Sequence, residues 1–282
     1  MALDYQHLKS IETPRQTFRY TDREAILYAL SVGFGRLPEE LPFVFERPAL
    51  KTVPTMAVVL ASTGLLYKTG VDMTKVLHGE QSLVLHRPLP PAAEIVAHSR
   101  VVEAYDKGAG KGAVLQLDTI AVLASDNEPL FTTTMTAIAR ADGGFGGCQS
   151  APPAPHVLPD RSADAIVSLR TRNDQALLYR LNGDRNPLHA DPAFAARAGF
   201  DRPILHGLCS YGIACRAVVS QACSYDADRI ESFAARFSAP AFPGDTIETE
   251  LWRDGDVVSF RCTAMERKAT IINNGKCVLR RA

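Results

Sequence analysis

The sequence has no excess of charge of either sign. Lys and Arg together number 31, and Asp and Glu together number 31, so the formal net charge of the 282 residues is zero. Nucleic-acid-binding proteins typically carry a basic excess or a basic stripe. The densest basic cluster here is only Arg280–Arg281, and we therefore expect no nucleic-acid partner.

Long hydrophobic runs are also missing. No stretch approaches the roughly 20 apolar residues that a membrane-spanning helix needs, and segment 1–5 lacks the basic region and apolar core of a signal peptide. The last residues, 279–282, do not form a peroxisomal signal of the S-K-L type. We expect no membrane association and a cytoplasmic, bacterial-type location. A eukaryotic origin would suggest the peroxisome, although the C-terminal signal is not seen.

Paired cysteine motifs are absent. None of the six cysteines forms a C-x-x-C pair, and no His cluster has the spacing of a zinc site. Such cysteines are typical of buried, free thiols in a reducing compartment, so we expect neither disulfides nor a metal. They are Cys148, Cys209, Cys215, Cys223, Cys262 and Cys277.

The first part of the chain has the pattern of a helix followed by strands. Thr21 and Glu24 have the spacing of a capping box at the start of a helix over 21–34. The proline-rich segment 36–54 is typical of a loop, and the apolar segment 56–66 is ambiguous between helix and strand. Four runs separated by short turns predict antiparallel strands at 82–86, 94–105, 113–124 and 130–139.

A segment rich in glycine and proline, 141–161, interrupts this pattern. Its glycines could suggest a phosphate-binding loop, but no P-loop lysine follows and the next residues are proline-rich. A linker is the better interpretation. After it the order of elements is repeated, with helices near 174–181 and 208–221 and strands at 230–237, 246–254, 257–266 and 271–279. We predict an α+β protein with two similar halves, 1–140 and 162–282.

The loop that ends the first helix of the second half carries three candidate catalytic groups. Gly183 and the Asn186–Pro187 pair stop the helix, and Asp191 is expected to cap the next one. Asp184, Asn186 and His189 lie between these stops. A carboxylate, an amide and an imidazole at one point suit the activation of water. A purely structural turn is the alternative, and the residues alone leave both open.

Gly207 lies at the predicted start of the buried helix near 208–221. Backbone N–H groups at a helix start are unpaired and the helix dipole is positive there. Because Gly207 has no side chain, a carbonyl oxygen could approach closely, as an oxyanion hole requires. An ordinary glycine turn would explain the residue equally well.

The motifs Tyr-Arg-Leu-Asn-Gly-Asp-Arg-Asn-Pro-Leu-His at 179–189 and Pro-Ile-Leu-His-Gly at 203–207 resemble the signature of type 2 enoyl-CoA hydratases of the MaoC-like superfamily. Segments at 20–33, 76–81, 106–110, 143–147, 235–240 and 243–244 are similar to the hydratase part of peroxisomal multifunctional enzyme type 2. The resemblance covers nearly the whole chain. It implies a double hot-dog fold, in which antiparallel sheets each wrap a long central helix.

The same resemblance implies (R)-specific hydration of trans-2-enoyl-CoA to (3R)-3-hydroxyacyl-CoA, or the reverse dehydration, without cofactor or metal. It implies a homodimer, and a first half that has lost the catalytic loop and accommodates medium or long acyl chains. Asp184 would act as base and His189 as acid, with Asn186 holding the water and Gly207 binding the thioester carbonyl. The residues implied to contact the CoA thioester are His78, Gly79, Lys107 and Phe237.

Two other functions remain open from the sequence. A hot-dog acyl-CoA thioesterase would direct water to C1 of the substrate instead of C3. A non-catalytic acyl-CoA binding module would keep the pocket without turnover, although Asp184, Asn186, His189 and Gly207 together disfavour it.

Overall fold

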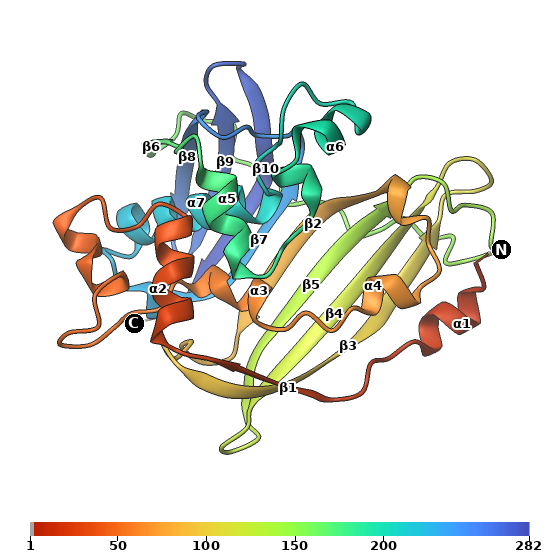
Figure 1. Ribbon diagram of the computed structural model, residues 1–282, viewed down its shortest axis with the longest axis horizontal. Helices are drawn as coiled ribbons and strands as arrows, with labels where there is room; N and C mark the ends of the chain where they lie inside the picture. The colour runs from red at the N-terminus through yellow and green to blue at the C-terminus, as the bar shows by residue number, and fades with distance from the viewer. Residues whose placement is uncertain (1–2, 282) are drawn as a thin grey trace.

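The computed structural model describes residues 3–281, and its ten strands form one antiparallel sheet (Figure 1). The strand order is β1-β3-β4-β5-β2-β7-β10-β9-β8-β6, so the first five positions come from the first half of the chain. The strands are β1 (Gln16–Tyr20), β2 (Val76–Leu85), β3 (Ala93–Asp106), β4 (Ala113–Leu123), β5 (Pro129–Ala139), β6 (Ala165–Arg170), β7 (Ile230–Phe237), β8 (Thr246–Asp254), β9 (Val257–Ala264) and β10 (Ala269–Leu279).

The two halves are joined through their inner edge strands. β2 pairs with β7 in an antiparallel register that runs from Glu80 opposite Arg236 to Val84 opposite Ser232. An edge strand exposes unpaired N–H and C=O groups, and here each half satisfies those of the other. The two sheets expected from the sequence are therefore one continuous sheet.

The second half wraps a long buried helix, α7 (Gly207–Ala222), whose start lies within one residue of the prediction. Most of its side chains are buried, because the sheet covers one side and the other helices cover the rest. The remaining helical segments of this half are short: α5 (Gln175–Tyr179), η4 (Arg180–Asn182), η5 (Pro187–His189), α6 (Pro192–Arg197) and η6 (Ala227–Arg229).

The first half has no single long central helix within the described residues. The ambiguous apolar segment is helical but broken into η2 (Pro54–Met56), α3 (Ala57–Leu60) and α4 (Leu65–Lys68), with Gly64 in the left-handed conformation at φ 71°. The proline-rich segment that we predicted as loop contains a helical turn, η1 (Pro38–Phe43). The other elements are α1 (Tyr5–Ser10), α2 (Asp22–Ser31) and η3 (Met73–Lys75).

The predicted capping box at the start of α2 is present, because the backbone N–H of Thr21 donates to Glu24 Oε2 at 2.9 Å. α2 packs beside α5 of the second half, so the main core contains residues of both halves. All six cysteines are free thiols and five are buried, as predicted. No helix within residues 3–281 is long and apolar enough to cross a membrane.

This arrangement, with two helix-and-sheet halves side by side, is the double hot-dog fold that the resemblance implied. The segment predicted as a linker has no regular element, and its prolines pass over the outer face of the sheet. The exact division into halves stays a prediction.

Candidate active site

The loop between α5 and α6 has the conformation that its sequence predicts. Gly183 ends η4 at φ 115°, in the left-handed region that favours glycine. The backbone N–H of Asn186 donates to Asp184 Oδ1 at 3.1 Å, and the Asn186 amide oxygen accepts from the Leu188 N–H at 3.0 Å. Local side-chain caps therefore hold the loop, and within residues 3–281 neither Asp184 Oδ2 nor Asn186 Nδ2 is used by these caps.

Three polar side chains meet beside this loop. Single ligand atoms of Asp184, His189 and His206 all lie within 4.8 Å of one another. His189 and His206 are buried, whereas the Asp184 side chain is 44% exposed. His206 belongs to a motif that we noted in the sequence, but it had no assigned role. A histidine directly before a buried helix was the only available signal.

Backbone carbonyls fix the tautomers of the two histidines. His189 Nδ1 lies 2.9 Å from the Ile204 carbonyl oxygen. A carbonyl only accepts, so Nδ1 carries the hydrogen and Nε2 of neutral His189 carries a lone pair. His206 Nε2 donates in the same way to the Asp184 carbonyl at 3.3 Å, and no partner is found for its buried Nδ1 among the described residues.

Burial keeps both imidazoles neutral at physiological pH. Desolvation is the main cause that lowers the pKa of His189 below its usual 6.5, against a smaller upward effect of the Ile204 hydrogen bond and Asp184. Desolvation and the neighbouring His189 lower the pKa of His206 to about 4. The site therefore offers a neutral base in a largely dry environment.

The same cluster does not suit a metal ion. The rings of His189 and His206 are stacked, with centroids 3.7 Å apart and 26° between their planes. A metal binds a ring nitrogen in the plane of the ring, where the lone pair points. One ion cannot lie in two nearly parallel planes separated by this distance, so the two histidines do not form a shared ligand pair.

Gly207 is the first residue of α7, as predicted. Within residues 3–281 neither its N–H nor that of Leu208 has a hydrogen-bond acceptor. A Cβ at Gly207 would lie 3.3 Å from two atoms of the Phe237 ring, so that ring covers the glycine. The helix start is therefore polar, positive and close to an aromatic wall.

His78 and Phe237 are neighbours, with ring centroids 4.9 Å apart in an edge-to-face arrangement. Burial lowers the pKa of His78 to about 4, against smaller upward effects of the Glu80 backbone, the Gln81 side chain and the charge of Asp184. Gly79 sits at a register shift in β2, and a Cβ there would lie 2.7 Å from Ile138. Packing against Ile138 therefore explains Gly79 without a ligand.

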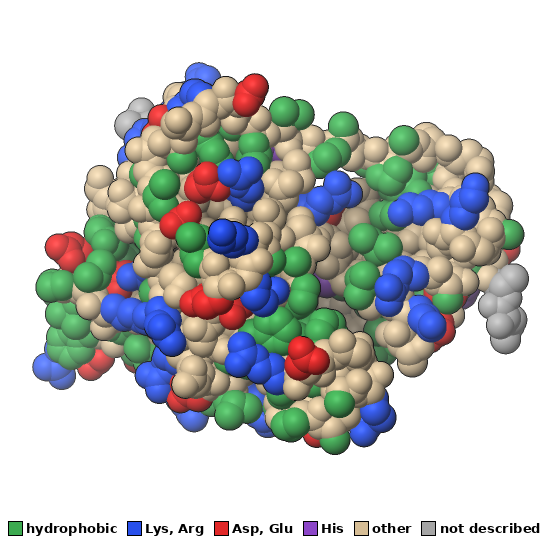
Figure 2. All heavy atoms as spheres, turned by 90° about the horizontal axis from the view of Figure 1, so that it is seen from above, with side chains coloured by type: hydrophobic (Ala, Val, Ile, Leu, Met, Phe, Trp, Pro, Cys, Tyr) green, Lys and Arg blue, Asp and Glu red, His purple; other side chains and the backbone are tan. Residues whose placement is uncertain are grey.

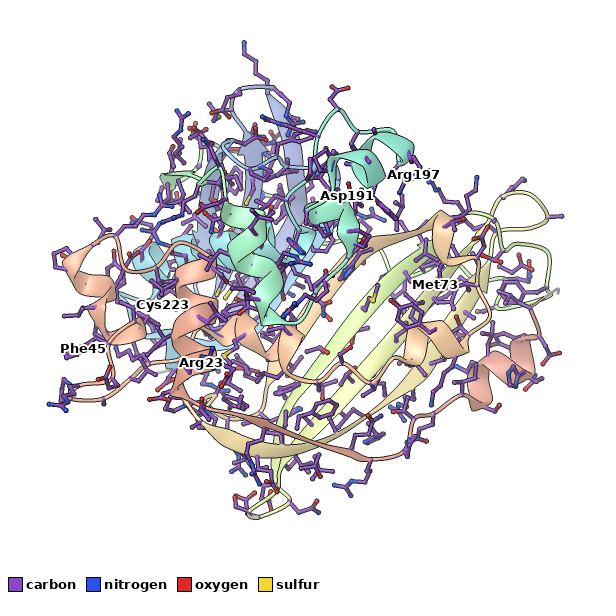
Figure 3. All side chains as sticks on the ribbon, in the orientation of Figure 1. Arg23, Phe45, Met73, Asp191, Arg197 and Cys223 are labelled. Carbon is purple, nitrogen blue, oxygen red and sulfur yellow. The ribbon has the colours of Figure 1, made fainter. Side chains whose placement is uncertain are left out.

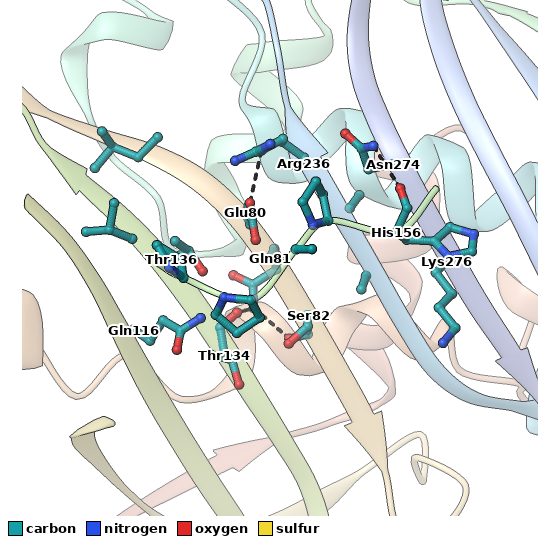
Figure 4. Close-up of a pocket in the computed structure, with 18 of the residues that line it drawn as sticks. Glu80, Gln81, Ser82, Gln116, Thr134, Thr136, His156, Arg236, Asn274 and Lys276 are labelled. Carbon is teal, nitrogen blue, oxygen red and sulfur yellow. Dashed lines mark hydrogen bonds and ion pairs between the residues drawn. The ribbon is translucent and has the colours of Figure 1, made fainter. Parts of the chain in front are cut away.

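Lys107 lies away from this group, exposed in the β3–β4 turn. It lines a cavity of about 460 Å³ between the outer face of the sheet and the segment 152–156, which also includes Glu80 and Arg236 (Figure 4). None of Asp184, His189 or Gly207 lines this cavity. From above, the molecule is hollowed between the second half and the end of the first half, and Lys and Arg side chains surround the hollow (Figure 2).

Two further residues near the loop are Tyr179, which was not predicted to belong to the site, and Asp191, which was predicted to cap a helix. Tyr179 is fully buried, and its ring centroid lies 4.9 Å from that of His206. Its hydroxyl group has no partner among the described residues, and burial raises its pKa. Its role was not predicted. Asp191 caps α6 as predicted, by accepting from the Ala193 N–H at 2.8 Å, and lies at the start of that helix (Figure 3).

Known proteins with this fold and loop can now be compared. A family profile described as MaoC like domain matches residues 156–274, and one described as MFE-2 hydratase 2 N-terminal domain matches residues 18–141. The 3-hydroxyacyl-thioester dehydratase Y of Mycobacterium tuberculosis is 42% identical, over 90% of this chain and 88% of its own length. Peroxisomal multifunctional enzyme type 2 of Mus musculus is 36% identical over 93% of this chain, which spans 36% of that longer protein.

A solved MaoC-like dehydratase from Phytophthora capsici has a TM-score of 0.88 and 32% sequence identity, with 98% of this chain and 99% of that chain covered. The fold and both profile matches define the chain as a MaoC-like protein. Within that class, the chain belongs to the MaoC-like hydratase 2 family. The resemblance stated from the sequence motifs is confirmed.

Proposed function

We propose that the protein hydrates trans-2-enoyl-CoA to (3R)-3-hydroxyacyl-CoA, and catalyses the reverse dehydration, in fatty-acid metabolism. The observation that carries this proposal is the neutral His189, which clusters with Asp184 and His206 directly before a helix start with unpaired N–H groups. The names of the relatives, which include an enoyl-CoA hydratase 2 and a 3-hydroxyacyl-thioester dehydratase, support it.

In this mechanism the thioester carbonyl accepts a hydrogen bond from the Gly207 N–H. Charge that develops on the carbonyl oxygen is stabilised there by the backbone donor and the helix dipole. Water bound between Asp184 and His189 attacks C3 while His189 Nε2 takes one of its protons. The resulting imidazolium returns that proton to C2 on the same face, so that the elements of one water add across the double bond.

The tautomer of His189 favours an assignment different from the one expected from the sequence. An acid needs a proton on Nε2, but Nδ1 already carries the hydrogen of the neutral ring. We therefore assign His189 as the base that then donates, and Asp184 as the group that orients the water and stabilises the imidazolium. Asn186 would hold the water through its Nδ2 group.

The remaining implied contacts concern the rest of the substrate. His78 and Phe237 would contact the thioester region beside Gly207, and Lys107 would pair with a CoA phosphate, because an ammonium group binds phosphate oxygens well. We expect medium or long acyl chains, since the broken helices of the first half leave its sheet less covered than α7 covers the second. We propose no cofactor or metal.

Loss of enoyl-thioester absorbance, with crotonyl-CoA and with trans-2-decenoyl-CoA, tests the proposal when the product is resolved chirally. The expected result is (3R) product, formed faster from the longer chain and unaffected by a chelator. Thiol release from saturated acyl-CoA would indicate a thioesterase instead, and binding without turnover would indicate an acyl-CoA binding module. The homodimer is also a proposal, which light scattering tests, and the cytoplasmic location stays a prediction.

A further inference from the structure

A single carboxylate connects two loops that lie 36 residues apart in the sequence. Asp106 is the last residue of β3. Its Oδ1 accepts from the Gly108 N–H at 2.8 Å and from the Gly144 N–H at 2.7 Å, and its Oδ2 accepts from the Gly146 N–H at 2.8 Å. The Gly144 bond is the main cause that lowers the pKa of Asp106. The carboxylate therefore holds the β3–β4 turn against segment 143–147.

Close backbone contacts make this junction dependent on glycine. A Cβ at Gly143 would collide with the carbonyl oxygen of Gly108, and one at Gly144 would lie 3.1 Å from Ala109 Cα. Behind the junction, Cys148 exchanges backbone hydrogen bonds with β3, at 3.0 Å to the Ala104 carbonyl and 3.1 Å from the Asp106 N–H. The two loops thus pack backbone to backbone.

Lys107 lies inside this junction, directly after Asp106. Its backbone N–H donates to the Gly112 carbonyl at 3.1 Å, which closes the turn, while its exposed side chain lines the cavity. Within residues 3–281 the Lys107 ammonium group forms no hydrogen bond or ion pair. The backbone of Lys107 therefore belongs to the turn that Asp106 holds.

We propose that Asp106 is a positioning residue for the CoA end of the substrate, which fixes the Lys107 turn by binding the backbone of segment 143–147. The inference rests on the proposed hydratase function and on Lys107 contacting a CoA phosphate. Asp106 touches no reacting atom. Its removal should weaken the recognition of phosphate-bearing substrates and leave the chemistry at His189 intact.

Kinetics with two substrates test this division. For trans-2-decenoyl-CoA, Asp106→Ala should raise KM about tenfold and leave kcat unchanged, the size expected for losing one charge-assisted contact. For the N-acetylcysteamine thioester of the same acid, which has no phosphate, KM should not change. Lys107→Ala should behave alike, and the double variant should be no worse than either single variant. Asp126→Ala is the matched control, because Asp126 holds the β4–β5 turn through the Glu128 N–H at 2.9 Å.

Amide hydrogen exchange supplies a readout that needs no activity. Asp106→Ala should speed exchange at Gly108, Gly144 and Gly146. Asp106→Asn keeps an Oδ1 acceptor and loses Oδ2, so it should deprotect Gly146 alone. This milder variant is informative if Asp106→Ala does not fold.

Several outcomes would overturn the inference. These are equal losses of kcat/KM for both thioesters, additive effects of Asp106→Ala and Lys107→Ala, or unchanged exchange in segment 143–147. A wild-type protein that hydrates neither thioester would contradict the proposed function by itself. In that case the affinity for free CoA, measured by calorimetry, tests the positioning role separately. Weaker binding by Asp106→Ala but not by Asp126→Ala supports that role, and wild-type affinity of Asp106→Ala contradicts it.

Discussion

The imidazole rings of His189 and His206 are stacked at a centroid distance of 3.7 Å, and each donates one N–H to a backbone carbonyl. The carbonyls belong to Ile204 and Asp184, so each ring is tied to the segment that carries the other. Two cations stacked in this way would repel each other strongly in a poorly solvated site. The pair therefore has a neutral resting state, and this decides how the site should respond to pH and to mutation.

Activity should depend on a neutral His189. Burial lowers its pKa below 6.5, so kcat/KM should be constant above that pH and should fall in more acidic solution as the base is protonated. The charge of Asp184 raises the same pKa. In Asp184→Asn the acid limb of the residual activity should therefore move to lower pH, whereas in Asp191→Asn it should stay. A limb that moved to higher pH would contradict the assignment of His189 as base.

Substitution of the reacting groups should remove the chemistry and spare the fold. We expect Asp184→Asn and His189→Gln to lower kcat by about 10²–10⁴, the usual contribution of a positioned acid or base. Asp191→Asn is the matched control, because it changes an exposed carboxylate that only caps α6. Steady-state kinetics and circular dichroism of the three variants check this. Wild-type turnover in either of the first two would remove that residue from the mechanism.

Histidines whose pKa is lowered in the folded protein should also make the fold sensitive to acid. His78 and His206 have pKa values of about 4 in the folded protein, mainly through desolvation, and about 6.5 when unfolded. The unfolded chain binds more protons between these values, so stability should fall as pH decreases from 6.5 to 4 and not above 6.5. His206→Phe should reduce this loss by up to a few kcal/mol. Urea unfolding of the wild type and of His206→Phe at pH 7.5 and 4.5 measures this loss of unfolding free energy. Equal losses in the two proteins would contradict the prediction.

Patterns that act over a few residues made most of the fold predictable. β7 and β8 begin and end where alternation and turn residues placed them, and α7 is one residue longer at each end than predicted. The short edge strands β1 and β6 were not predicted, because five or six residues carry little periodic signal. The pairing of β2 with β7 depends on contacts about 150 residues apart in the sequence, which no local pattern encodes.

The part of the site that lies on one loop could be predicted from the sequence. Asp184 and His189 meet as expected from their short separation, but the stack of His189 on His206 requires the tertiary fold. Lys107 illustrates the opposite case, since family resemblance named it and the structure places it in a cavity apart from the loop. Its connection to segment 143–147 through Asp106 appears only when both loops are seen together.

A buried ion pair ties the middle of α7 to the first half of the protein. Arg216 Nη2 lies 2.6 Å from Glu40 Oε1, and their side chains are 7% and 0% exposed. Glu40 Oε2 also accepts from the backbone N–H groups of Arg36 and Leu37. The carboxylate thus organises η1 as well as pairing with the helix that carries the site.

Removing one partner of this pair should be strongly destabilising. Arg216→Met leaves the charge of Glu40 buried and uncompensated, which typically costs about 3–5 kcal/mol of unfolding free energy. Arg172→Met is the matched control, because it breaks an Arg–carboxylate pair with Asp174 whose side chains are 59% and 55% exposed, and such exposed pairs contribute about 0–1 kcal/mol. Combining Arg216→Met with Glu40→Gln should recover part of the loss, since no buried charge is then left unpaired. Urea unfolding at pH 7.5 measures all three, and equal losses in the two single variants would show that burial does not isolate the pair from solvent.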